Sequence, residues 1–345
     1  MRNEPAVRKI ENRKIKFLDR AQDFYRGKRI LVPGGAGFIG SRLTKRLLSL
    51  GAIVTVVDPL EKFCGGHVFN LHSHLKNIQL VRKKIETYIQ ESNLKEVSCI
   101  FNCVGLSDHH LGFLRPELDY RINCYSGVKL LQKLAKDQVP AKIVSIGSRS
   151  QYGQAESKVN ESAPLKPLDV QSVHKTALEQ YHTIYGSSFG VDFVFLRLTN
   201  TYGPGQRMRG NGIGFVGEII RNSIGEKEVI IYGGLDRVKD LIYVEDVVDA
   251  LICAGMLEEK STRIYNVGGR ACRVGELIEC LKKEIPSIRV RIQEFPPQIK
   301  KVDTGDVVLN SGTFSRATGW HTRTTIKEGI TSTIKYYRSC KRYYW

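Results

Sequence analysis

Short apolar runs alternate with amphipathic stretches through the first part of the chain. The runs are RILV at 29–32, IVTVV at 53–57, IQLV at 78–81, CIFNCV at 99–104, KIVSIGS at 142–148 and VDFVFLRL at 191–198. Each run predicts a buried strand, and helical spacing between them at 38–48, 117–136 and 171–185 predicts helices. Strands that alternate with helices form a mostly parallel sheet covered on both faces. The pattern therefore predicts an α/β fold with a doubly wound parallel sheet.

Beyond residue 200 the pattern changes to loops and shorter elements. The glycine-rich stretch TYGPGQRMRGNGIG at 201–214 predicts a long loop. Helical spacing returns at 213–223, 245–257 and 274–284, and a strand is expected near 289–293. These elements predict a smaller C-terminal α/β lobe.

The changes of pattern divide the chain into four expected segments. They are a leader at 1–27, a first domain at 28–199, a smaller lobe at 200–337 and a tail at 338–345 that is basic and aromatic. The shorter segments after residue 200 also suggest that the smaller lobe is partly interleaved with the first domain.

Composition is that of an ordinary globular protein, with 345 residues, 41% hydrophobic and 26% charged. No apolar run approaches the ~18 residues of a membrane span, and the N-terminus lacks the apolar region of a secretory signal. The eight cysteines have no paired spacing, which predicts reduced thiols in a cytoplasmic protein. The histidines of HVFNLHSH at 67–74 lack suitably spaced acidic or cysteine neighbours, so we predict no metal site.

The formal charge of +18 is the unusual feature of the composition. Residues 1–28 hold nine Lys and Arg against four Asp and Glu. Such a surface attracts nucleic acid, anionic membranes or polyanionic substrates. No helix-turn-helix, zinc-finger or RNP motif accompanies the charge. A solvated basic surface is the simpler interpretation.

A glycine turn follows the first predicted strand. In GGAGFIG, Gly34, Gly37 and Gly40 precede or open a helix whose first residues include Phe38 and Ile39. Missing side chains allow the tight turn, the approach of a pyrophosphate to the backbone and close packing of the helix. Asp58 ends the second strand, where a carboxylate accepts hydrogen bonds from a ribose diol and repels a 2′-phosphate. The arrangement predicts a Rossmann-type site for NAD, although Arg42 leaves NADP open.

The sequence resembles the extended short-chain dehydrogenase/reductase superfamily, within it the nucleotide-sugar epimerase/dehydratase branch. The likeness runs from about residue 28 to 337 and is carried by ILVPGGAGFIGS, LDYRINCYSGVKLL, VSIGSRSQYG, LRLTNTYGPGQ, KDLIYVEDVVDAL and YNVGG. The resemblance implies a homodimer that binds NAD and a nucleotide-diphosphate sugar, and a reaction in which a sugar carbon is transiently oxidised.

Three positions correspond to the catalytic Ser/Thr, Tyr and Lys of that family, and two of them keep the family's residue type. Ser148 matches the residue that holds the sugar hydroxyl, and Lys175 matches the lysine that binds the nicotinamide ribose. Gln171 stands where the family has its proton-transferring tyrosine, and an amide has no useful pKa near neutrality.

Four residues are candidates to replace that tyrosine. They are His109, His110, His174 and Tyr152. His109 and His110 follow IFNCVG, in the loop that borders the nicotinamide and sugar in this family, and an imidazole has a suitable pKa. His174 neighbours Lys175, but adjacent helical positions point about 100° apart. Tyr152 matches a non-catalytic tyrosine of the family.

The residues after Ser148 bear on the type of reaction. Relatives that eliminate water or decarboxylate carry acids there, whereas this chain has Arg149 and Ser150. The resemblance therefore favours a 4-epimerase-like reaction over a dehydratase or decarboxylase. A non-catalytic NAD-binding scaffold is the remaining alternative, because the tyrosine is missing.

At the substrate end, the resemblance implies that Asn200 and Lys239 bind the nucleotide diphosphate, with Arg207 of the long loop near them. Lys239 stands where the family has an arginine, and Asp303 replaces a second arginine in the run DTGD. The cations that could compensate for Asp303 are Arg237, Lys300 and Lys301, and Arg209 of the long loop could also reach the phosphates.

Overall fold

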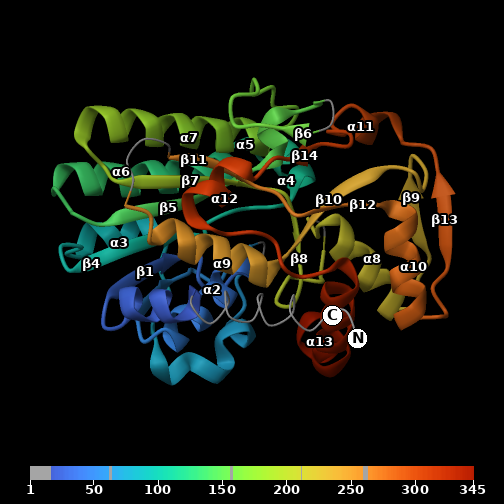
Figure 1. Ribbon diagram of the computed structural model, residues 1–345, viewed down its shortest axis with the longest axis horizontal. Helices are drawn as coiled ribbons and strands as arrows, with labels where there is room; N and C mark the ends of the chain where they lie inside the picture. Colours follow the sequence, from blue (N-terminus) through green and yellow to red (C-terminus); the bar gives the residue numbers. More distant parts are fainter. Residues whose placement is uncertain (1–16, 62–63, 156–157, 211, 259–262) are drawn as a thin grey trace.

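The computed structural model describes residues 17–61, 64–155, 158–210, 212–258 and 263–345. Within them, seven parallel strands form one sheet in the order β11-β7-β5-β4-β1-β2-β3. The strands are β1 (Arg29–Pro33), β2 (Ile53–Val57), β3 (Gln79–Val81), β4 (Val97–Asn102), β5 (Lys142–Ser148), β7 (Phe193–Leu198) and β11 (Ile264–Val267). The predicted doubly wound α/β fold is confirmed (Figure 1). β11 was not predicted, because IYNV is a short run between loops.

Helices cover both faces of this sheet (Figure 1). They are α2 (Phe38–Ser49) and α9 (Val244–Gly255) on one face, and α3 (Ile85–Glu91), α6 (Ser126–Lys136) and α7 (Val170–Phe189) on the other. The alternation along β1 explains the two layers, since Ile30 and Val32 are buried with α2 and α9 while Leu31 is buried with α3 and α6. The order of the strands reverses direction at β1, so the pocket beside β1 and β4 opens at the carboxyl ends of the strands.

The smaller lobe has its own apolar core. Its strands are β8 (Asn200–Tyr202), β9 (Val229–Tyr232), β10 (Val238–Tyr243), β12 (Arg270–Arg273) and β13 (Val290–Gln293), and its helices are α8 (Phe215–Ile224), α10 (Val274–Glu284) and α13 (Ile326–Tyr344). β8, β10 and β12 form one sheet, and β9 pairs with β13. α9 and β11 leave this lobe to pack against the large sheet, so the chain crosses between the two cores several times.

Shorter elements connect the two parts. They are η1 (Val68–Asn77), α4 (His109–Leu114), α5 (Pro116–Tyr120), η2 (Arg121–Tyr125), η3 (Arg149–Tyr152), β6 (Lys158–Val159), α11 (Pro297–Lys300), β14 (Val308–Leu309) and α12 (Gly312–Thr318). The single helix predicted at 117–136 is in fact α5, the π-helical turn η2 and α6, because the backbone inserts an extra residue around the buried Asn123. In the described part of the chain, no helix is long and apolar enough to cross a membrane.

Both ends of the described chain pack against the body of the fold. Residues 17–25 are helical, and Ala21 and Tyr25 are buried in the core beside α9, where the Tyr25 hydroxyl donates to the carbonyl of Ile252. Residues 1–16 of the leader lie outside the described residues. The segment 338–345 extends α13 past a kink at Cys340, and it packs against the core of the smaller lobe through the buried ring of Tyr344 and the partly buried rings of Tyr343 and Trp345.

Asn70 joins three distant segments of the chain at the end of α13. Its Nδ2 donates to the carbonyl of Ala36 at 3.0 Å and to the carbonyl of Gly205 at 3.2 Å. Its Oδ1 accepts the hydroxyl of Tyr344. The side chain is 2% exposed, so a single buried amide connects the glycine turn, the long loop and the C-terminal helix.

A buried ion pair lies between α7 and β7. The Arg197 guanidinium donates to both carboxylate oxygens of Glu179, at 2.8 and 2.6 Å, and the Gln151 amide adds a bond to the same carboxylate at 2.9 Å. The two charged side chains are 5% and 1% exposed.

Removing one partner of this pair leaves an uncompensated buried charge. We expect Glu179→Ala to lower the free energy of unfolding by ~3–5 kcal/mol, measured by urea denaturation. Glu279→Ala is the matched control, because Glu279 pairs with Lys282 on the exposed surface of α10, where a pair contributes ~0–1 kcal/mol. Equal effects of the two substitutions would contradict this assignment.

Candidate functional site

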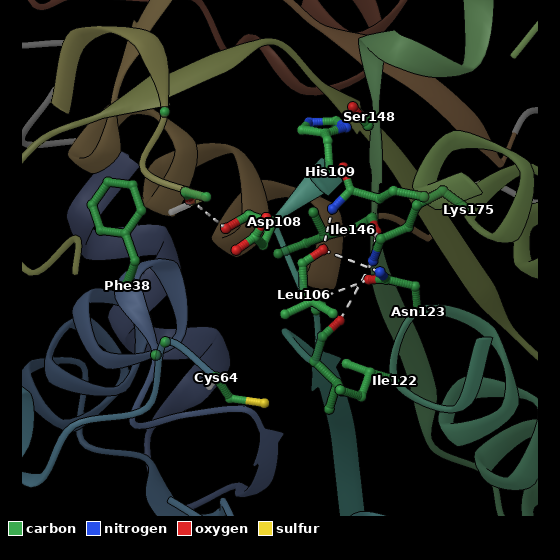
Figure 2. A pocket seen from close by; sticks show the side chains of 18 of the residues that line it. Phe38, Cys64, Leu106, Asp108, His109, Ile122, Asn123, Ile146, Ser148 and Lys175 are labelled. Atoms are coloured by element: carbon green, nitrogen blue, oxygen red, sulfur yellow. Dashed lines mark hydrogen bonds between the residues drawn. The ribbon is translucent and has the colours of Figure 1, made fainter. Parts of the chain in front are cut away.

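A cavity of about 2090 Å³ lies at the carboxyl ends of the large sheet and extends into the smaller lobe. It is larger than the ~300–1,000 Å³ of a pocket for one small molecule. The candidate residues that line it are Gly34, Gly37, Phe38, Ile39, Gly40, Asp58, His109, His110, Ser148, Gln171, Lys175, Asn200 and Arg207. Residues predicted from separate motifs thus share one cavity, parts of which are drawn in Figure 2.

The glycine turn has the tight geometry that a dinucleotide site requires. Gly34 has φ +72°, and a Cβ there would lie 2.7 Å from the backbone of Cys103. A Cβ on Gly40 would lie 2.3 Å from the carbonyl oxygen of Gly34. The N-terminus of α2 has no side-chain cap and no acidic residue in its first turn. Its free N–H groups and positive helix end fit a pyrophosphate.

Asp58 supports this turn from the end of β2. One carboxylate oxygen accepts the N–H of Ala36 at 3.1 Å, and the other accepts the N–H of Leu60 at 2.9 Å. Burial raises the pKa of Asp58, and these two hydrogen bonds act against that shift. The Arg42 guanidinium, which could have met a 2′-phosphate, pairs with Glu245 of α9 instead. The residues present therefore fit NAD.

Ser148 lies at the end of β5, where it caps the short turn η3. Its hydroxyl accepts bonds from the N–H of Ser150 at 3.1 Å and from the hydroxyl of Ser150 at 2.8 Å. Both bonds use oxygen lone pairs, so the O–H of Ser148 is left to donate into the cavity.

Lys175 lies one turn into α7 and points at the ends of β4 and β5. Its ammonium donates to the carbonyls of Ile146 at 3.1 Å and Val104 at 3.4 Å (Figure 2). Burial lowers the pKa of Lys175 to about 8, although the nearby Asp119 favours the charged form. Burial thus lowers the pH at which the Lys175 ammonium loses its proton.

Gln171 occupies the first turn of α7, one turn before Lys175. Its Nε2 donates to the carbonyl of Leu106, which also accepts from Asn123 Nδ2 at 3.1 Å. The side chain is 7% exposed. This amide ties α7 to the loop after β4, and it has no proton to give or take.

The histidine candidates have different surroundings. His109 Nδ1 lies 2.9 Å from Asp169 Oδ2, while His110 is exposed and has no hydrogen-bond partner among the described residues. His174 Nδ1 lies 2.7 Å from the buried Asp119 and does not line the cavity. Tyr152 is also absent from the lining and bonds to Arg197 and Asn266 in the core.

Cations gather where the cavity enters the smaller lobe. The Arg149 guanidinium lines it and donates to the Thr304 hydroxyl at 3.0 Å. Burial lowers the pKa of Arg149, which Asp240 and Asp303 counteract. Arg237, a candidate to compensate for Asp303, is itself paired with Asp303 at 2.7 Å and with Asp306 at 3.2 Å.

Lys239 differs from the other candidates, because it is not among the described residues that line the cavity. Its ammonium lies 5.8 Å from the ring centroid of Phe215, which does line it. Burial and then the charges of Arg237 and Arg149 lower the pKa of Lys239 to about 8. Asn200 lines the cavity, and its Nδ2 donates to the carbonyl of Asp240 at 2.8 Å.

Comparison with known proteins agrees with this geometry. The sequence model of the NAD dependent epimerase/dehydratase family matches residues 30–268. The chain belongs to this family. It is 26% identical over 317 residues to a putative UDP-glucose 4-epimerase of Methanocaldococcus jannaschii, covering 91% of this chain and 99% of that protein.

Solved structures of the family have the same fold. One is UDP-glucose 4-epimerase with UDP-glucose from Thermotoga maritima, with TM-score 0.81 and 27% identity over 91% of this chain and 99% of that one. Another is the UDP-glucose 4-epimerase complex with NAD from Thermus thermophilus, with TM-score 0.78 and 27% identity over 90% and 99%. Like its relatives, this epimerase/dehydratase family member uses NAD.

Asp169 and Asn123 are site residues that the sequence did not single out. Asp169 caps α7 by accepting the N–H of Ser172 at 2.7 Å, so the pattern D-x-x-S before a helix was its available signal. Asn123 lies inside the family motif LDYRINCYSGVKLL but contacts Leu106, which is distant in sequence.

The packing of the glycine turn can be tested with one methyl group. We expect Gly40→Ala to weaken NAD binding roughly tenfold or more, or ~1.4 kcal/mol, because the added Cβ meets the carbonyl of Gly34. The measurement is calorimetric titration of apoprotein with NAD. Gly275→Ala in α10 is the control, since its Cβ would meet nothing closer than 3.5 Å. Unchanged NAD affinity in Gly40→Ala would contradict the assignment.

Proposed function

We propose that this protein interconverts nucleotide-diphosphate sugars as an NAD-dependent 4-epimerase. The observation that carries the proposal is the single cavity that runs from the glycine turn, past Ser148 and Lys175, to Asn200 and Arg207. Its volume of about 2090 Å³ leaves room for a dinucleotide and a nucleotide sugar together. The relatives in complex with NAD and with UDP-glucose support the same pair of ligands.

Different residues of the cavity bind NAD and orient the sugar. Gly34 and Gly40 leave space for the pyrophosphate of NAD. Asp58 would accept hydrogen bonds from the hydroxyls of the adenosine ribose, and Lys175 would donate hydrogen bonds to the nicotinamide ribose. Bound NAD supplies the acceptance and return of a hydride at the sugar carbon. Ser148 donates its free O–H to the reacting hydroxyl, which orients that carbon in the site.

Epimerisation fits the residues around Ser148 better than elimination. Arg149 and Ser150 follow Ser148, so the positions that carry acids in dehydrating and decarboxylating relatives offer no carboxyl to protonate a leaving hydroxyl. Returning a hydride to the opposite face of a carbonyl carbon needs no such acid. Of the reactions considered, 4-epimerisation therefore requires the fewest catalytic groups that this site lacks.

The test is addition of UDP-glucose, UDP-galactose, their N-acetylated forms or dTDP-glucose to protein loaded with NAD. We expect a transient NADH absorbance and the 4-epimer in the product, identified by proton NMR. Lys175→Met is expected to lower NAD retention and to abolish both signals. Retained NAD with neither absorbance change nor product from any of these sugars would refute the proposal in favour of a non-catalytic scaffold.

Arg149 is the cation that we assign to the anionic end of the substrate. Its guanidinium reaches the hydroxyl of Thr304, next to Asp303, which stands where the family carries a phosphate-binding arginine. Arg237 is neutralised there by Asp303 and Asp306. Arg149, just after β5, thus supplies a positive charge near Asp303, where the family's arginine is missing.

We expect Arg149→Met to raise the Kd of UDP roughly 10- to 100-fold, because a hydrogen bond to a charged group contributes ~1.5–3 kcal/mol. The measurement is calorimetric titration of NAD-loaded protein with UDP. Arg263→Met is the control, since Arg263 pairs with Asp192 at the opposite end of β7 from the cavity. If UDP affinity is unchanged and only the intact UDP-sugar binds more weakly, Arg149 contacts the sugar and the assignment to the phosphates is wrong.

A further inference from the structure

The tyrosine position of this site holds no group that can transfer a proton. Gln171 donates its amide hydrogen to the carbonyl of Leu106, and a neutral amide cannot accept a proton near neutral pH. Oxidation of a sugar hydroxyl nevertheless releases one proton for each hydride removed. A titratable side chain near Ser148 is therefore required if the proposed function holds.

His109 and Asp169 form a hydrogen-bonded couple beside that position. The ring Nδ1 of His109 lies 2.9 Å from Oδ2 of Asp169. The carboxylate is 5% exposed, whereas the imidazole is 50% exposed and lines the cavity. Figure 2 shows the ring of His109 toward the end of the cavity where Ser148 lies. One ring nitrogen is thus engaged with protein, and the other, Nε2, is available to a ligand.

The N-terminal end of α7 carries both Asp169, which binds His109, and Gln171, which occupies the tyrosine position. Asp169 is its N-cap and Gln171 lies two residues further on, while Leu106 and His109 belong to one segment after β4. Two bonds, Gln171 to Leu106 and Asp169 to His109, fasten that segment to the helix. The imidazole is therefore fixed next to the helical turn on which relatives carry their tyrosine.

We propose that His109 is the proton-transferring residue of this enzyme, with Asp169 as its positioning residue. The inference rests on the proposed function. Asp169 accepts Nδ1–H and so keeps the lone pair of the neutral ring on Nε2. When the sugar O–H bond breaks, its proton moves to Nε2 and its electron pair forms the carbonyl, while the hydride leaves the carbon for NAD.

The reverse step restores both hydrogens. The hydride returns to the carbonyl carbon, and the carbonyl oxygen takes the proton back from Nε2. Asp169 stays ionised throughout and stabilises the imidazolium. Burial alone would raise the pKa of Asp169, but hydrogen bonds from His109 and Ser172 bring it below its usual value, which suits a permanent anion.

The first test separates proton transfer from binding. We expect His109→Gln to lower kcat by about 10²–10⁴ while the Kd of the nucleotide sugar and the NAD content stay within about threefold. His321→Gln is the control, because His321 lies on the exposed surface and, among the described residues, its only hydrogen bond is with the carbonyl of Gly319. Replacing Gln171 by Tyr in the His109→Gln protein is expected to restore at least part of the lost kcat, because a phenol would again stand one turn before Lys175.

The second test measures the tautomer of His109, and so its hydrogen bond with Asp169, without requiring catalysis. Nitrogen-15 NMR of labelled histidine should find neutral His109 in the Nδ1–H form in the wild type and shifted toward Nε2–H in Asp169→Asn, which keeps the helix cap. A lower kcat in Asp169→Asn, with unchanged thermal unfolding, is expected to accompany the shift.

Two results would overturn the proposal: wild-type kcat in His109→Gln, or a raised KM with unchanged kcat. The same tautomer in both proteins would remove the role of Asp169. A wild-type protein that shows no epimerase activity refutes the proposed function instead, and the NMR measurement still reports whether the couple exists.

Discussion

Helix α7 is fixed against the carboxyl ends of β4 and β5 by the polar groups of its first two turns. Lys175 donates to the carbonyls at those strand ends, and Gln171 donates to the loop that follows β4. Buried donors without partners would cost ~1–3 kcal/mol each, so any rotation of the helix is unfavourable. The cofactor site, Ser148 and the histidine couple keep their relative positions only while this helix keeps its orientation.

The same constraint explains how the chain can lack the usual tyrosine and keep the architecture around it. Gln171 has a structural role, because its amide binds the backbone carbonyl of Leu106. Where the cavity enters the smaller lobe, Asp303 pairs with Arg237. Gln171 and Asp303 both line the cavity, whereas the buried pair of Arg197 and Glu179 does not.

Much of the fold and part of the site could be predicted from the sequence. Six of the seven strands of the large sheet were predicted from apolar runs, and only β11 was missed. The glycine turn with Asp58 was predicted because its constraints act between residues close together along the chain. The pairing of His109 with Asp169 could not be predicted, since 60 residues separate the two. Arg149 and Thr304 are 155 residues apart, and only the folded chain brings them together.

The buried amide of Asn70 has a consequence for the order in which the protein folds during translation. All of its hydrogen bonds are made only when Tyr344 is in place, because its Oδ1 accepts the Tyr344 hydroxyl while its Nδ2 donates to the carbonyls of Ala36 and Gly205. During translation the Rossmann sheet can assemble while the last turns of α13 are still inside the ribosome. A nascent chain can therefore form its parallel sheet before the Asn70 amide has all of its hydrogen-bond partners.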